Sequence, residues 1–206
     1  MKKRAAVIER KTKETQIRGR LNLDGEGKSS ISTGVGFLDH MLELFAKHGL
    51  FDLQLKAKGD LHIDLHHTNE DIGLALGEAF REALGDKKGI RRMGSAFVPM
   101  DETLARVRVV TDLSGRPHFR LDWAAGRKPA EFSRGGRIPY GLEDAKHFLE
   151  SFSARSGLTL HVDVLKAGGD AHHLLESVFK ALGRALREAV ELDSRVKGVP
   201  STKGKL

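Results

Sequence analysis

The sequence predicts an α+β protein built from two similar halves, because one arrangement of residues occurs twice in the chain. The pentad His-His-x-x-Glu stands at residues 66–70 and again at residues 172–176, an offset of 106 positions. A histidine followed by an apolar helical pattern precedes each pentad, as HMLELF at 40–45 and as HFLESF at 147–152. Two copies in the same order indicate a duplicated structural unit.

Hydrophobic periodicity predicts the same succession of elements in both halves. Apolar side chains alternate along 51–57 and 158–164, as in strands, and recur at helical spacing along 37–45 and 142–152. The expected strands are 5–10, 16–23, 30–33, 51–57, 96–100, 104–112, 118–121 and 158–164. The expected helices are 37–45, 72–84, 142–152 and 174–190. Each half should therefore form a four-stranded sheet with two helices on one face.

The length of 206 residues fits one medium-sized domain or two small ones that pack closely. The basic connection at 85–92 is the expected boundary, so the halves should span 1–86 and 87–206 within one compact unit. No apolar run approaches the roughly 20 residues of a membrane span. Charge returns at Glu9, too early for a signal peptide, and a cytoplasmic location fits.

The net charge of +7 allows three interpretations. It can simply keep the surface solvated, or it can favour anionic ligands such as phosphate esters. Nucleic acid is the weakest option, because the chain has one Trp and one Tyr and no basic run interleaved with aromatic residues for stacking. The absence of cysteine excludes disulfides and leaves histidine and carboxylate as the ligands of any metal site.

Six of the ten histidines occupy repeated positions, which favours metal ligation over isolated hydrogen-bonded core histidines. Neighbouring side chains on a helix point about 100° apart, so adjacent histidines cannot easily chelate one ion. One histidine of each pentad should join the glutamate on one ion, while the other turns to a second ion. The histidine upstream, His40 or His147, completes a ligand set. Eight ligands for two ions fit either octahedral Mn²⁺ with open positions or a closed tetrahedral zinc site.

Two arginines beside glycine turns are candidates for phosphate binding. Arg92 precedes Met93-Gly94, and Arg116 follows Ser114-Gly115. A guanidinium suits bidentate phosphate contact, although either residue could be an ordinary surface arginine. The tail at 198–204 could be a disordered basic end or a small loop that donates hydrogen bonds to a phosphate.

The chain resembles the imidazoleglycerol-phosphate dehydratase family of histidine biosynthesis nearly from end to end. The segments that carry the resemblance are 10–15, FLDHML at 37–42, DLHHTNED at 64–71, MDETLA at 100–105, DAHH at 170–173 and STKG at 201–204. The resemblance implies two ribosomal-S5-domain-2-like halves, trimers assembled into a twenty-four-subunit shell, and two Mn²⁺ per subunit at subunit interfaces.

The resemblance also implies the roles of particular residues. The metal ligands would be His40, His66, His67, Glu70, His147, His172, His173 and Glu176. The substrate-binding residues would be Glu14, His40, His48, His66, Glu70, Arg92, Arg116, His172, Lys180, Ser201 and Lys203. The candidates for acid-base catalysis are Glu14, Glu70 and Glu176.

The reaction implied is dehydration of D-erythro-imidazole glycerol phosphate to imidazole acetol phosphate, with manganese-bound imidazolate stabilising the developing charge. The expected partner is thus a small phosphate ester, with neither nucleic acid nor membrane involved. A dinuclear-metal phosphoester hydrolase is the alternative enzyme. A second alternative is a non-catalytic protein whose histidine clusters hold an assembly together through metal.

Overall fold

The fold comprises two sheets and four helices in the part of the chain that the structure, a computed structural model, describes. That part is residues 3–101, 103–110, 117–123, 140–167 and 170–204, with the backbone alone for 105–110 and 123. The strands are β1 (Ala5–Lys11), β2 (Thr15–Asn22), β3 (Ser29–Ser32), β4 (Asp52–Gly59), β5 (Met93–Met100), β6 (Thr103–Val110), β7 (His118–Trp123) and β8 (Thr159–Lys166). The helices are α1 (Gly36–Gly49), α2 (His66–Leu84), α3 (Leu142–Ser156) and α4 (Ala171–Val190).

The two sheets have the same topology. Their strand orders are β1-β2-β4-β3 and β5-β6-β8-β7. In each sheet the first three strands of that order pair antiparallel, and the last pair, β4 with β3 or β8 with β7, is parallel. The predicted α+β fold with two similar halves is therefore confirmed.

Side-chain alternation explains why each sheet has one buried face. On β4, Leu53 and Leu55 are buried while Gln54 and Lys56 are exposed. Because successive side chains of a strand point to opposite faces, this pattern gives the sheet one apolar face for the helices. α1 and α2 contact the first sheet, and α3 and α4 contact the second.

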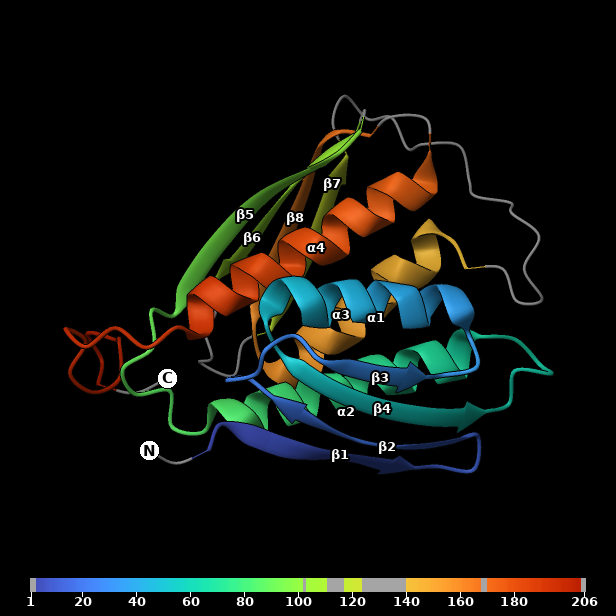
Figure 1. The fold of residues 1–206 in the computed structure, drawn as a ribbon, viewed down its shortest axis with the longest axis horizontal. Coiled ribbons are helices and arrows are strands. Elements are labelled where there is room, and N and C mark those ends of the chain that lie inside the picture. The colour runs from blue at the N-terminus through green and yellow to red at the C-terminus, as the bar shows by residue number, and fades with distance from the viewer. Residues whose placement is uncertain (1–2, 102, 111–116, 124–139, 168–169, 205–206) are drawn as a thin grey trace.

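The four helices lie between the two sheets, so both halves share one core (Figure 1). α1 packs against α4, and α2 packs against α3, which joins helices from different halves. Aromatic rings also join the two halves: Phe45 of α1 and Phe80 of α2 both meet Phe152 of α3, at centroid distances of 6.2 and 5.7 Å.

Two equivalent glycines allow the helices of different halves to approach closely. A Cβ atom added to Gly77 on α2 would lie 2.6 Å from the carbonyl oxygen of Phe152, and one added to Gly183 on α4 would lie 2.6 Å from that of Phe45. Because only glycine leaves room for this approach, the two residues fix the spacing between α2 and α3 and between α4 and α1.

None of the helices in the described part of the chain combines the length and apolarity that crossing a bilayer requires. The last two residues of the predicted strand 104–112 lie outside the described residues.

Candidate metal centres and the surrounding site

Both pentads open a helix because an aspartate caps each one. The Oδ1 atoms of Asp64 and Asp170 accept hydrogen bonds from the backbone N–H groups of His66 and His172, both at 2.8 Å. An aspartate here satisfies a backbone donor that the first helical turn leaves unpaired. The two caps are repeat equivalents, and they fix the first turns of α2 and α4, which carry the pentads.

One candidate metal centre combines α1 with α4. His40, His172 and Glu176 each offer a ligand atom, and these atoms lie within 4.8 Å of one another. The Nε2 atoms of His40 and His172 both lie 2.9 Å from Oε1 of Glu176. Three donors therefore converge on one point, in the combination of imidazole and carboxylate that suits a borderline divalent ion.

Lys180 helps to keep the carboxyl of Glu176 ionised. Its ammonium nitrogen lies 2.6 Å from Oε2 of Glu176, one helical turn earlier on α4. Burial raises the pKa of the Glu176 carboxyl, but hydrogen bonds from Lys180, His40 and His172 outweigh burial and lower the pKa to about 2. Glu176 is therefore a carboxylate at neutral pH and able to ligate a cation.

The other candidate centre combines α2 with α3. His66, Glu70 and His147 form the second group whose ligand atoms lie within 4.8 Å of one another. The rings of His66 and His147 stack at a centroid distance of 4.4 Å, and Nε2 of His147 lies 3.9 Å from Oε1 of Glu70. This group is looser and more open, since the Glu70 side chain is 42% exposed and that of Glu176 only 10%.

Each centre draws on both halves of the chain. The upstream histidine of the first half, His40, joins the second pentad, and His147 of the second half joins the first pentad. The glycine contacts described above, α1 with α4 and α2 with α3, bring these helices together. Neither half of the chain by itself contains all three residues of a centre.

The remaining histidines of the pentads, His67 and His173, belong to neither group. Their rings stand at 76° to His66 and at 90° to His172. Nδ1 of His67 lies 2.9 Å from Oδ2 of Asp60. Adjacent imidazoles thus point in different directions, as helical geometry requires.

The turn between β1 and β2 places Glu14 beside His67. Its Oε1 lies 3.9 Å from Nε2 of His67. Asp71, the residue after the first pentad, anchors this turn by accepting hydrogen bonds from Arg10 at 2.7 Å and from Thr15 at 2.5 Å. The repeat comparison gave no signal for Asp71, because its counterpart in the second pentad's helix is Ser177.

Asn69, inside the first pentad, links the two halves, and the sequence pattern did not indicate this role. Its side-chain N–H donates to the backbone oxygen of Asp144 at 2.8 Å, and its Oδ1 accepts from the hydroxyl of the buried Tyr140 at 3.1 Å. These bonds tie α2 to the start of α3, which carries His147. The spacing of the pentad gave no reason to single out either of its middle residues.

The phosphate candidates lie at the far end of α4. The Nη1 of Arg92 donates to the carbonyl oxygen of Pro200 at 2.7 Å, next to Ser201, and Lys203 donates its backbone N–H to the Ser201 hydroxyl at 3.2 Å. Arg92, Ser201 and Lys203 thus belong to one corner of the molecule, whereas Arg116 lies outside the described residues.

This corner is remote from His172. The backbone N–H of Arg92 donates to Ala189, which follows His172 by 17 positions on the same helix. At 1.5 Å per residue, that separation is roughly 25 Å.

His48 lies between these regions. The backbone at His48 and Gly49 packs against Gly183, one turn from Lys180. Burial lowers the pKa of the His48 imidazole, and the positive charges of Lys180 and Arg184 add to that effect.

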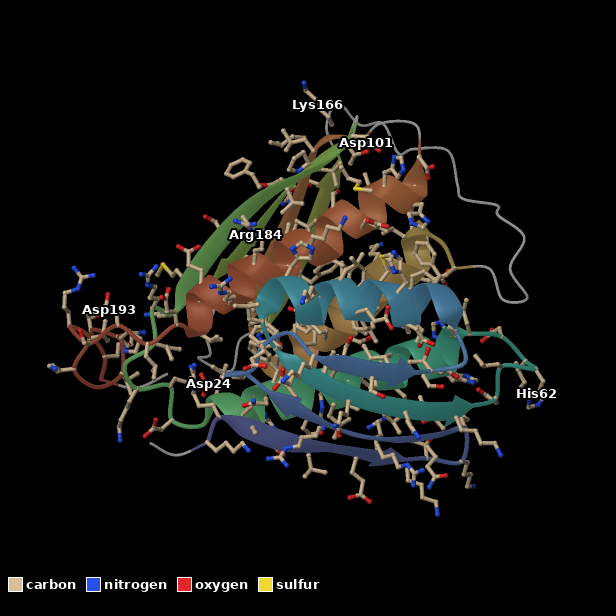
Figure 2. All side chains as sticks on the ribbon, viewed as in Figure 1. Asp24, His62, Asp101, Lys166, Arg184 and Asp193 are labelled. Atoms are coloured by element: carbon tan, nitrogen blue, oxygen red, sulfur yellow. The ribbon has the colours of Figure 1, made fainter. Side chains whose placement is uncertain are left out.

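A cleft of about 620 Å³ adjoins His48. Its lining residues are Lys47, His48, Leu50, Ser95, Ala96, Phe97, Arg184, Arg187, Glu188 and Glu191. Figure 2 shows Arg184 on the exposed side of α4.

Fold and site together define a class of protein: a duplicated α+β protein with two histidine–carboxylate groups able to hold divalent metal. Residues 33–186 match the sequence profile of imidazoleglycerol-phosphate dehydratase. The chain is 55% identical to the imidazoleglycerol-phosphate dehydratase of Geobacillus kaustophilus, covering 98% of this chain and 99% of that one. It is 52% identical to that of Clostridium botulinum, over the whole of both chains.

Solved structures agree. The crystal structure of the Staphylococcus aureus dehydratase has a TM-score of 0.75 at 37% identity, covering 92% of this chain and 99% of that one. The Pyrococcus furiosus enzyme, crystallised in complex with (S)-C348, has a TM-score of 0.75 at 36% identity, covering 96% and 99%. The chain belongs to the imidazoleglycerol-phosphate dehydratase family.

Proposed function

We propose that this chain dehydrates D-erythro-imidazole glycerol phosphate to imidazole acetol phosphate in histidine biosynthesis, as a hydro-lyase with two Mn²⁺ per subunit. The observation that carries the proposal is the pair of His-His-Glu groups, each assembled from both halves of the chain. Membership of the family supports the reaction, and the donor atoms support the metal.

The donor set fits a divalent ion of the Mn²⁺ type. Each group supplies two imidazole nitrogens and one carboxylate oxygen already close enough to share an ion. His67 and His173 would each complete a group as the fourth protein ligand, leaving positions open for substrate. When bound, such an ion supplies Lewis acidity and a template for the imidazole of the substrate.

We infer that the active site is shared between subunits. Arg92 and the tail are roughly 25 Å from the His172 group along α4, a separation much longer than a three-carbon phosphate ester with one imidazole ring. Arg92, Ser201 and Lys203 would therefore hold the phosphate of a substrate whose ring reaches the metal group of a neighbouring chain. A closed assembly of trimers into twenty-four subunits, with metals at the interfaces, satisfies this requirement.

Acid-base catalysis falls to carboxylates near these groups. Glu14 is half-exposed beside His67, on a turn that Asp71 holds in place, so it can reach a substrate bound there. Glu70 and Glu176 would share the role from within the metal groups. His48 and Lys180 would contact the substrate near the Glu176 group, because Lys180 contacts Glu176 directly.

The test is a dehydration assay on imidazole glycerol phosphate after chelation and after Mn²⁺ is restored. We expect product only with metal. Absence of product at every metal loading, or release of inorganic phosphate in its place, would contradict the proposal, and the second outcome would favour a phosphoester hydrolase.

Two sets of variants test the residue roles. His67→Ala and His173→Ala should each weaken metal binding and lower turnover, so normal turnover in both would refute the shared ligand sets. Glu14→Gln should lower kcat while the assembly stays intact by light scattering. If the histidine groups only hold an assembly together, Glu14→Gln will show no catalytic defect.

A further inference from the structure

Three cations follow one another along one face of α4. Arg184 comes one turn after Lys180, and Arg187 lies on the next turn. Both arginines are exposed, and neither has a carboxylate within 4.0 Å in the part of the chain that the structure describes. Like charges three or four residues apart on a helix repel each other, so the row costs stability. Helix stability therefore does not explain why cations stand at these positions.

The other half of the chain closes the equivalent face with ion pairs. The repeat offset of 106 aligns Arg184 with Glu78 and Arg187 with Arg81 on α2. The carboxylate of Glu78 lies 3.2 Å from the guanidinium of Arg81 and 2.9 Å from that of Arg155 on α3. The exchange of glutamate for arginine thus distinguishes a face closed by ion pairs from one whose arginines lack such pairs among the described residues.

The end of α1 adds positive charge to the same place. Lys47 and His48 line the cleft of about 620 Å³ together with Arg184 and Arg187. Burial lowers the pKa of the His48 imidazole, and the charges of Lys180, Arg184 and Lys47 lower it further. The imidazole therefore lies in the positive field of these cations.

The carboxylates that line the cleft are engaged by other groups. Glu188 accepts a hydrogen bond from the backbone N–H of Ser95 at 2.8 Å. The guanidinium of Arg91 lies 3.9 Å from Glu188 and 3.3 Å from Glu191. Both glutamates come after the two arginines along the chain, at the end of α4. The cleft is therefore most positive at the end nearer the Glu176 group.

We propose that Arg184 and Arg187 draw the doubly charged phosphate ester towards the Glu176 group through their electric field, without contacting it. This inference rests on the proposed function, because it needs a phosphate ester bound near Lys180. A cleft lined by charges of one sign concentrates a ligand of the opposite sign. The attraction acts equally on the bound substrate and on the transition state, so it lowers KM and leaves kcat unchanged.

The experiment measures kcat and KM of the full-length, Mn²⁺-loaded protein above about pH 7, where a phosphate ester is a dianion. Wild type is compared with Arg184→Lys, Arg184→Gln and Arg184→Glu, a series in which the charge falls stepwise while the position stays the same. The assay is run at ionic strengths of about 10 mM and about 1 M, where charges are screened over about 30 and 3 Å.

KM should follow the charge at position 184. A unit charge about 10 Å from a dianion in water changes an equilibrium constant by about threefold at low ionic strength. Arg184→Lys should therefore match wild type, whereas Arg184→Gln should raise KM about threefold and Arg184→Glu about tenfold. At the higher ionic strength each ratio to wild type should fall to about one, and kcat should be unchanged throughout.

Two further variants complete the test. Arg81→Gln is the matched control, because it removes the repeat-equivalent cation from the other helix pair, and it should keep the KM of wild type. Arg187→Gln should raise KM about threefold at low ionic strength, so it carries the test if the variants at position 184 do not fold. Light scattering should show the same assembly for every variant.

Unchanged KM at low ionic strength, a fall in kcat, or a rise in KM that is as large in Arg184→Lys as in Arg184→Gln would overturn attraction at a distance. So would a rise that persists at high ionic strength. An equal rise in Arg81→Gln would attribute the effect to net charge alone, and a changed assembly would place Arg184 in a contact between copies of the chain. Each of these results overturns this proposal only. A wild type that forms no product would overturn the proposed function itself, so the two failures are distinguishable.

Discussion

The carboxylate of Glu176 is the point at which the imidazole and ammonium groups of its candidate metal centre meet. Two imidazoles and one ammonium donate to a carboxylate that is only 10% exposed. One turn after its counterpart Glu70, the position equivalent to Lys180 is Leu74. The two centres offer the same kinds of ligand atom, but they differ in neighbouring charge and in the exposure of their carboxylates. Single residues cause this difference.

Acid should destabilise the metal-free protein through Glu176. The pKa of its carboxyl is near 2 in the fold and 4.5 for an ordinary glutamate. A lowered pKa stabilises the fold fully above about pH 5, and this contribution, about 3 kcal/mol, is lost as pH falls from 4.5 towards 2. Lys180→Met should raise the pKa of Glu176 and move acid unfolding, followed by circular dichroism, to higher pH. Lys47→Met, on the exposed side of α1, is the control and should not.

Arg92 has a left-handed backbone, with φ of 72°. This conformation costs a non-glycine residue about 1–2 kcal/mol. We therefore expect that the arginine is kept at this position because its guanidinium binds the phosphate of the substrate. Arg92→Ala and Arg92→Gly should both raise KM for the phosphate ester by a similar factor. The glycine variant should be more stable than the alanine variant by about 1 kcal/mol in urea unfolding, since it relieves the strain. Unchanged KM in both would remove Arg92 from the phosphate site.

At the scale of elements, the contacts between helices of different halves decide whether the metal groups form. His40 reaches Glu176 because α1 and α4 approach closely at Gly183, and His147 reaches Glu70 because α2 and α3 approach at Gly77. Asn69 and Tyr140 add hydrogen bonds to the second of these contacts.

Gly77→Ala and Gly183→Ala should therefore separate these helix pairs. Alanine favours a helix over glycine by about 1 kcal/mol, but a Cβ atom 2.6 Å from a backbone oxygen forces the backbone to move. We expect a net loss of about 1–3 kcal/mol in urea unfolding together with weaker Mn²⁺ binding. Gly36→Ala is the matched control, because a Cβ there meets no atom within 4 Å. A loss of stability equal to that in Gly36→Ala would show that close approach is unimportant.

For the whole molecule, the proposed site shared between subunits predicts that two different defective variants complement each other. His172→Ala should be inactive alone, and Arg92→Ala should be nearly inactive at substrate concentrations far below its raised KM. Co-expressed, they should regain part of the dehydration activity, because some sites then combine an intact His172 group from one chain with an intact Arg92 from another. If one chain supplied every group of a site, co-expression would restore nothing.

The sequence by itself determined the two-halved α+β fold and singled out the histidines and glutamates that are candidate metal ligands. Alternation, helical spacing and the repeated pentads are local patterns, and they report local structure directly. Helical geometry also indicated that the adjacent histidines of a pentad diverge, which the 76° and 90° ring angles agree with.

Only the tertiary structure decided which residues meet across the repeat. The exchange of His40 and His147 between halves depends on which helices pack together, and that depends on side-chain volumes at positions such as Gly77 and Gly183. Asp71 and Asn69 act through hydrogen bonds to residues distant in the sequence, and neither position is repeated in the other half of the chain. The local pattern names the candidate ligands, whereas packing between elements determines which of them lie together and which charges surround them.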